Sequence, residues 1–119
     1  MAYYIFNASR DSALRQMRQR LWAVDAVERH RDALAAGDLV LVYLGAPESA
    51  FIGRARLASS VDAHGDVAFA EVEEWDPPVP MRDVLARIGP SDTAKAEFDA
   101  AVVLIAASEY EAAISAASA

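Results

Sequence analysis

Trp22 has the clearest capacity of any side chain in this sequence to form a binding site. It lies in the stretch Leu21-Trp22-Ala23-Val24, between two segments that favour helix and directly before a capping signal. A tryptophan placed there can act as the wall of a pocket, because its ring combines a large apolar face with one N–H donor. The alternative is that Trp22 fills the core beneath the two helices. If the ring is a wall, the residues around it would support a small binding site.

Residues that support catalysis are sparse. The chain has no cysteine, two histidines (His30 and His64) and five glycines that are scattered singly. A thiolate nucleophile and the usual structural zinc sites are therefore excluded, and no glycine-rich phosphate loop is present. The adjacent Glu73 and Glu74 would face opposite sides of a strand, so they cannot share one substrate. We predict a protein that is not an enzyme and that uses no metal or cofactor.

Charge is distributed unevenly along the chain. The net charge is −7, but residues 1–56 hold eight arginines against six acidic residues, a net of +2, and residues 57–119 hold three basic residues against twelve acidic ones, a net of −9. The acidic balance argues against nonspecific adhesion to nucleic acid, whereas the asymmetry permits a local basic face. The arginines that could meet phosphates are Arg10, Arg15, Arg18, Arg29, Arg31 and Arg54. The alternative is a solvated surface without a ligand.

The length of 119 residues predicts one domain, which we expect to span residues 1–119. No apolar run approaches the ~20 residues that cross a bilayer. The polar Asn7 and Arg10 follow Met1 too soon for a signal peptide. Together with the absence of cysteine, these features lead us to expect a cytoplasmic protein.

The pattern of apolar residues predicts an α+β domain built on a curved sheet or a small open barrel. Ser9 is expected to cap the first helix, and Asp25 and Glu28 form a capping box that opens a second, which Gly37 ends. Gly53 has no side chain and should let a neighbouring backbone or a ligand approach closely. Strands are expected at residues 3–8, 38–44, 51–57, 67–75 and 102–105, the last with helix as its alternative, and helices at residues 10–20, 25–37, 81–88, 92–100 and from 108 onward.

Two further details follow from the side-chain patterns. In the strand at residues 51–57, Phe51, Gly53, Ala55 and Leu57 are expected on one face, and Ile52, Arg54 and Arg56 on the other. Residues 76–80 hold three prolines and are expected to form an extended connector without ladder hydrogen bonds.

Several short motifs follow one another in a distinctive order. They are Asn7-Ala8-Ser9, Trp22, Gly37-Asp38, Tyr43, Phe51-x-Gly53-x-Ala55 and the stretch at residues 72–80. In order and spacing they resemble the EVE domain of the PUA-like superfamily, and Phe-x-Gly-x-Ala is also similar to a motif of the related YTH domains. The resemblance covers most of the chain. It implies a PUA-like fold, a small curved sheet or open β-barrel with helices inserted after the first strand and at the C-terminus.

The resemblance also implies a function. PUA-like relatives receive a modified base flipped out of a nucleic acid, so this chain would be a non-catalytic reader of a methylated or otherwise modified base of DNA or RNA, with an effector protein supplied separately. Trp22 would stack on the base. The other base-binding candidates are Asn7, Ser9, Asp11, the backbone at Ala23 and Val24, His30, Tyr43, Phe51 and Trp75, and the phosphate-binding candidates are Arg10, Arg29, Arg31 and Arg54. Core packing is the alternative role of His30, Tyr43, Phe51 and Trp75.

Two departures from the resembled pattern matter. Residues 58–66 hold no aromatic residue where YTH domains place further cage tryptophans, and Asn7 stands where EVE relatives often carry lysine. The competing hypothesis is a small-molecule or protein-interaction module with the same fold and no affinity for nucleic acid. A basic groove beside Trp22 would favour the reader, and a purely acidic rim would favour the competing module.

Overall fold

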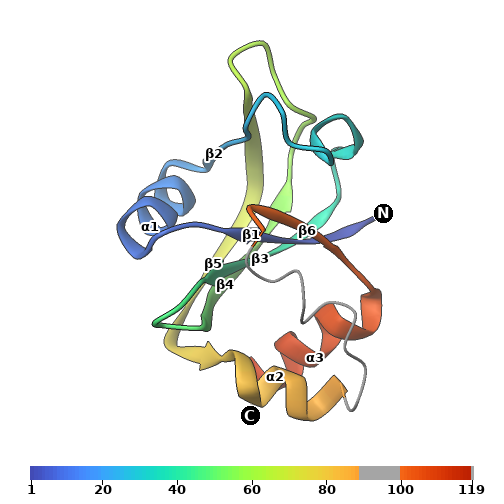
Figure 1. The fold of residues 1–119 in the computed structure, drawn as a ribbon. Helices are drawn as coiled ribbons and strands as arrows, with labels where there is room; N and C mark the ends of the chain where they lie inside the picture. The colour runs from blue at the N-terminus through green and yellow to red at the C-terminus, as the bar shows by residue number, and fades with distance from the viewer. Residues whose placement is uncertain (89–99, 119) are drawn as a thin grey trace.

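The structure is a computed structural model that describes residues 1–88 and 100–118. In this part of the chain, strands and helices are mixed in sequence and pack together (Figure 1). The strands are β1 (Tyr3–Asn7), β2 (Leu21–Ala23), β3 (Leu39–Leu44), β4 (Ala50–Leu57), β5 (Asp66–Pro80) and β6 (Val102–Ile105). The helices are α1 (Arg10–Gln19), α2 (Met81–Ile88) and α3 (Ala107–Ser118), with a 3-10 turn, η1 (Arg31–Ala33).

All the strands of the described residues belong to one sheet, in the order β2-β5-β4-β3-β1-β6. β1 and β3 run parallel, and the other neighbouring pairs run antiparallel. The sheet is curled into half a barrel, with α1 at one side and α2 and α3 together at the other end (Figure 1). The predicted α+β fold on a curved sheet is confirmed. None of the described helices has the length and apolarity needed to span a membrane.

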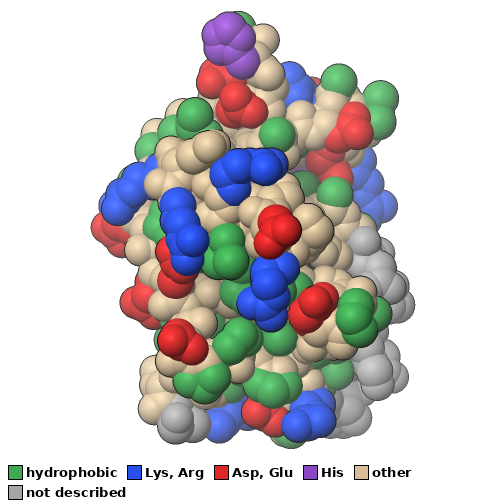
Figure 2. Space-filling view, turned by 90° about the vertical axis from the view of Figure 1, so that its left-hand side faces the viewer, with side chains coloured by type: hydrophobic (Ala, Val, Ile, Leu, Met, Phe, Trp, Pro, Cys, Tyr) green, Lys and Arg blue, Asp and Glu red, His purple; other side chains and the backbone are tan. Residues whose placement is uncertain are grey.

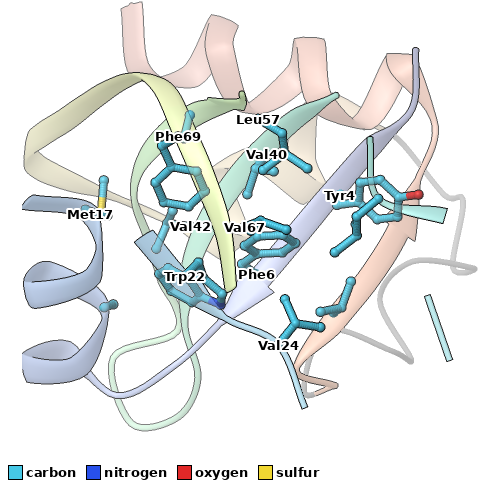
Figure 3. Close-up of a cluster of buried hydrophobic side chains, with 14 of the residues drawn as sticks. Tyr4, Phe6, Met17, Trp22, Val24, Val40, Val42, Leu57, Val67 and Phe69 are labelled. Carbon is cyan, nitrogen blue, oxygen red and sulfur yellow. The ribbon is translucent and has the colours of Figure 1, made fainter. Parts of the chain in front are cut away.

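Both faces of the sheet are buried. Successive side chains of a strand point to opposite faces, so Phe6 and Val42 lie in one core while Ile5 and Leu41 lie in the other. Side chains of α1 and the ring of Trp22 complete the first core (Figure 3). Side chains of α2 and α3 complete the second. Burial on both faces explains why β1 and β3 are nearly continuous apolar runs.

The end of α1 produces a strand that the sequence did not predict. Arg20 adopts a left-handed conformation (φ 60°) that ends the helix, and its guanidinium donates to the carbonyl of Ala70 at 3.0 Å. The chain then pairs with β5, with Leu21 opposite Ala68 and Ala23 opposite Asp66. Leu21 is 43% exposed in this strand.

The predicted helix at residues 25–37 does not form. A carboxylate oxygen of Asp25 accepts the N–H of Val27, and one of Glu28 accepts the N–H of His30, each only two residues further on. Such local bonds favour turns over helix because the side chain replaces the backbone partner. Val27 is 88% exposed in these turns. Gly37 still has the positive φ (92°) that was predicted, but in a turn.

Gly53 lies where three elements meet. A Cβ there would overlap the backbone carbonyl of Glu73 in β5 and lie 2.6 Å from the Cε of Met17 in α1. The predicted close approach is therefore confirmed, and the approaching group is a backbone. A register shift between Phe51 and Gly53 turns Phe51 to the second core while Ala55 stays in the first. The prediction that these side chains share one face is wrong because a shift of one residue exchanges the faces.

β5 continues through the prolines that were expected to be unpaired. Val79 pairs with Phe51, and Pro80 pairs with Ala50. Among the described strands this end of β5 has β4 on one side only, and an edge segment tolerates the missing N–H of proline.

The C-terminal elements were predicted with one error of position. α2 and β6 form at the predicted residues, whereas the helix expected at residues 92–100 lies outside the described residues except for its last position. α3 begins at Ala107, one residue before its expected start, and its capping box uses Glu109, which accepts the N–H of Ala106 at 3.0 Å. Helix geometry selects the carboxylate three residues after the cap.

Asp38 is a buried carboxylate whose contribution to stability can be tested by mutation. It is 5% exposed, and its two carboxylate oxygens accept the N–H groups of Ala2 and Ala35, each at 3.0 Å. Asp38→Ala leaves both donors without a partner and is expected to lower the free energy of unfolding by about 2–5 kcal/mol. Urea titration measures this loss. The exposed Asp32 is the control, since Asp32→Ala should change stability by less than about 0.5 kcal/mol. An Asp38→Ala variant as stable as Asp32→Ala would contradict the prediction.

Candidate binding pocket beside Trp22

A pocket of about 500 Å³ opens where α1, β2 and the end of β1 meet. This volume lies within the range of small-molecule sites, roughly 300–1,000 Å³. α1, β2 and the loop that follows β2 supply much of the wall, and the residue before β6 supplies another part. The lining residues are Asn7, Ala8, Ser12, Arg15, Gln16, Gln19, Leu21, Trp22, Ala23, Val24, Asp25, Glu28, Asp66, Ala101 and Val102.

Trp22 belongs to the pocket and to the core at once. Its ring centroid lies 5.4 Å from that of Phe6 and 6.0 Å from that of Phe69 (Figure 3). Only 4% of the residue is exposed, although it lines the pocket. The two interpretations of Trp22, pocket wall and core filling, therefore both describe part of its surroundings. The indole is a floor that the core holds rigidly.

The side chain of Gln16 makes two hydrogen bonds at the polar edge of the pocket. Its Oε1 accepts the N–H of Ala23 at 2.8 Å, and its Nε2 donates to the hydroxyl of Ser12 at 3.0 Å. The N–H of Val24 donates instead to the carbonyl of Gly65 at 2.8 Å. Of the two backbone donors predicted to meet a base, the one at Ala23 is thus held by a side chain that a ligand could replace, and the one at Val24 is held within the backbone.

Charge around the pocket is mixed. Arg15 is the cation on its wall, against the carboxylates of Asp25, Glu28 and Asp66. Asp25 and Glu28 each use one oxygen to accept a backbone N–H, so part of their hydrogen-bonding capacity is already satisfied. Figure 2 shows basic and acidic side chains interspersed on the α1 side of the molecule, with apolar side chains between them. The surroundings are neither a basic groove nor a purely acidic rim.

No family model and no curated protein matches the sequence. Solved structures do match over nearly the whole chain. ASCH from Zymomonas mobilis aligns with a TM-score of 0.65 at 9% identity and covers 96% of this chain and 94% of its own. The chain has an ASCH-type, PUA-like fold.

Two further solved structures align with nearly the whole chain. Rpa0253 from Rhodopseudomonas palustris aligns with a TM-score of 0.70 at 18% identity, covering 99% of this chain and 94% of its own. A protein from Pseudomonas putida aligns with a TM-score of 0.72 at 13% identity, covering 98% and 99%. The predicted PUA-like architecture is confirmed by this agreement of fold at low identity.

Three predicted aromatic residues lie on the other face of the sheet of this PUA-like fold. Tyr43 and Phe51 have their ring centroids 4.9 Å apart in the second core, and the Tyr43 hydroxyl lies 3.9 Å from the sulfur of Met81. Trp75 packs against the same core and donates to a carboxylate oxygen of Glu73 at 2.6 Å. We correct the predicted site by removing all three. Strand alternation turns Tyr43 and Trp75 away from Trp22, and the register shift after Phe51 turns its ring to the same opposite face. The hydrogen bond from the Trp75 indole lowers the pKa of Glu73.

The remaining base-binding candidates are divided between several places. Asn7 lines the pocket, whereas Ser9 lines a neighbouring hollow and its hydroxyl makes no capping bond. Asp11 is exposed and lines neither. The ring of His30 packs against Tyr4 with centroids 6.0 Å apart, and His30 is absent from the pocket wall. His30 thus has the packing role that was its alternative.

The four predicted phosphate-binding arginines do not form one patch. Arg10 lines the neighbouring hollow, while Arg31 donates to the carbonyl of Val24 at 3.2 Å and is absent from the pocket wall. Arg29 donates to the Nε2 of His30 at 3.3 Å. Arg54 lies on the face that carries the second core, 3.4 Å from the carboxylate of Glu73. Arg54 is therefore removed from the site, for the same reason as the three aromatic residues.

Sequence reasoning did not assign several residues of the pocket wall. Ser12, Gln16 and Gln19 recur at spacings of three and four along α1, and that polar stripe was a usable signal for one face of the helix. Asp66 gave no such signal, because its place in the wall depends on the pairing of β2 with β5. Within the described residues, no group of three His, Asp or Glu side chains is arranged to hold a metal ion.

Proposed function

We propose that this chain is a non-catalytic reader of the EVE type that binds a modified base of DNA or RNA in the pocket beside Trp22. The observation that carries the proposal is the pocket of about 500 Å³, which combines an aromatic floor with side-chain amides and an arginine. A flipped base needs a flat contact for its ring and polar partners for its edge.

The polar edge, more than the ring contact, would provide the affinity. Because Trp22 is only 4% exposed, its stacking would contribute less than the ~1–3 kcal/mol per base of an open aromatic platform. The amides of Asn7 and Gln16 can each donate and accept, so they suit a base edge that presents both kinds of group. Arg15 stands on the same wall and is suited to a phosphate of the bound strand.

A small-molecule or protein-interaction module is the second candidate. Three carboxylates against one arginine on the pocket wall favour it, because they oppose an anionic ligand. A ligand with donor groups or a positive charge would suit these carboxylates better than a nucleic acid strand does. The two candidates therefore differ in how binding responds to the charge at position 15.

Binding to labelled oligonucleotides tests the proposal. Single-stranded and duplex oligonucleotides, with and without methylated or hydroxymethylated cytosine or methylated adenine, are titrated with the protein at low salt. We expect a preference for one modified strand, and we expect Arg15→Glu to weaken its binding roughly tenfold through lost and reversed phosphate attraction. The matched control is Arg82→Glu on α2, whose side chain is 88% exposed on the second-core side.

Two results would overturn this proposal. If the folded wild-type protein binds none of these oligonucleotides, the pocket does not read these bases and the second candidate is favoured. If binding occurs but ignores the modification, the site is a nucleic-acid site without the proposed selectivity. Equal losses in Arg15→Glu and Arg82→Glu would show that attraction comes from net charge and not from this pocket.

A further inference from the structure

A second hollow of about 550 Å³ adjoins the pocket. The two share Asn7, Ala8 and Ala101, so they meet across the end of β1. The turn between β3 and β4 and the beginning of α1 supply the rest of its wall. Its lining residues are Asn7, Ala8, Ser9, Arg10, Gly45, Ala46, Pro47, Glu48 and Ala101.

Backbone hydrogen bonds fix the floor between the two hollows. The N–H of Asn7 donates to the carbonyl of Ala101 at 2.9 Å, and the N–H of Ala8 donates to the carbonyl of Tyr43 at 3.3 Å. Residues 7 and 8 are therefore held to the sheet on both sides. A ligand that spans both hollows would lie across residues 7 and 8. Because this backbone is already held in place, binding loses little of its conformational freedom.

The second hollow carries one cation and one anion. Arg10 and Glu48 both line it, both are exposed, and within the described residues neither side chain makes a hydrogen bond or an ion pair. Arg10 and Arg15 are five residues apart on α1, about 7.5 Å along the helix axis. One lines each hollow, so the two cations can address two phosphates of one strand.

We propose that the second hollow binds the sugar-phosphate unit next to the base held in the pocket, with Arg10 on the phosphate. The inference rests on the proposed function and adds a second subsite to it. The full site then takes a ligand of at least two nucleotides. Glu48 lines the same hollow, so its negative charge would repel this phosphate and weaken binding in the subsite.

The length of the ligand provides the first test. A modified nucleoside, the corresponding dinucleotide and a longer oligonucleotide of the preferred sequence are compared by titration calorimetry. We expect the dinucleotide to bind at least about tenfold more tightly than the nucleoside, because it adds charge-assisted contacts to phosphate.

Two variants, one that removes a positive charge and one that removes a negative charge, provide the second test. Arg10→Ala is expected to weaken dinucleotide binding about three- to tenfold while nucleoside binding is unchanged. With the longer oligonucleotide, it is expected to reduce the slope of log affinity against log salt by about 0.7. Glu48→Gln is expected to strengthen dinucleotide binding about twofold, since it removes a like charge near the phosphate. Arg82→Ala is the control for a lost surface arginine and should change neither ligand's affinity.

The outcomes separate this inference from the function on which it rests. If the long oligonucleotide does not bind, both fail. If it binds with the expected preference but the dinucleotide gains nothing over the nucleoside, or Arg10→Ala changes neither affinity nor salt slope, the second subsite is refuted and the reader function stands. Equal effects of Arg10→Ala and Arg82→Ala would also refute it.

Discussion

A Gly53→Val variant is expected to lose about 3 kcal/mol of unfolding free energy, because its side chain would clash with groups that already fill the space beside Gly53. A Cβ at this position would overlap the Glu73 carbonyl and lie 2.6 Å from the Cε of Met17. The Met17 side chain can turn aside, but the Glu73 carbonyl belongs to the paired backbone of β5 and cannot move without disturbing the ladder. Urea denaturation followed by circular dichroism measures the loss.

Gly45→Ala is the matched control for Gly53→Val. The atoms nearest to a Cβ at Gly45 are those of the Asn7 side-chain amide, at 3.6 and 3.7 Å, which is ordinary van der Waals contact. A methyl group added there should change stability by less than about 0.5 kcal/mol. A Gly53→Val protein that unfolds at the same urea concentration as Gly45→Ala would contradict the packing described for this part of the sheet.

Elements with strong local patterns were predicted well. β1, α1, β3 and α2 each have an apolar run or a helical period together with an end signal, so local sequence determines them. The failure at residues 25–37 has a local cause as well. Asp25 and Glu28 fit a capping box and equally fit two successive turns, and in the structure their carboxylates form the local bonds of turns.

Errors in the predicted site came from register, which sequence period does not determine. The pattern of β4 placed Phe51 beside Gly53 and Ala55, but the shift after Phe51 sends its ring to the opposite face. The pairing of Ala23 with Asp66 brings a carboxylate to the pocket from the far end of β5. Both facts depend on contacts between distant segments. The sequence alone does not show which segments pair or in which register, so neither fact could be predicted from it.

The resemblance to the EVE pattern named some residues that the structure brings together and others that it places on the opposite face of the sheet. Trp22, Asn7 and the backbone at Ala23 do meet in one wall. Tyr43 and Phe51 belong to the same motif order but serve the second core. Motif order therefore reports which strands neighbour one another, while the direction of each side chain follows from strand alternation and bulges.

Replacing Trp22 should affect stability and binding together, and the two effects can be separated. Trp22→Ala removes a core ring that contacts Phe6 and Phe69, so we expect a loss of about 3–5 kcal/mol. If Trp22→Ala alone loses oligonucleotide binding, the cause can be unfolding of the protein or loss of the ring that contacts the ligand. Trp22→Phe keeps an aromatic ring in the core and should cost less than Trp22→Ala.

Trp75→Phe completes the comparison, because Trp75 packs on the second core and lies outside the pocket wall. Urea denaturation gives the stability of each variant, and titration with the preferred oligonucleotide gives its affinity. If Trp22 contacts the ligand, Trp22→Phe should weaken binding about threefold while Trp75→Phe leaves it unchanged, since a smaller ring reduces the contact. If Trp22→Phe binds as well as wild type, the ring serves the core alone, and the affinity of the pocket must come from its polar edge. If Trp22→Ala is as stable as wild type, the ring is not a core residue, and the rigid floor described for the pocket is wrong.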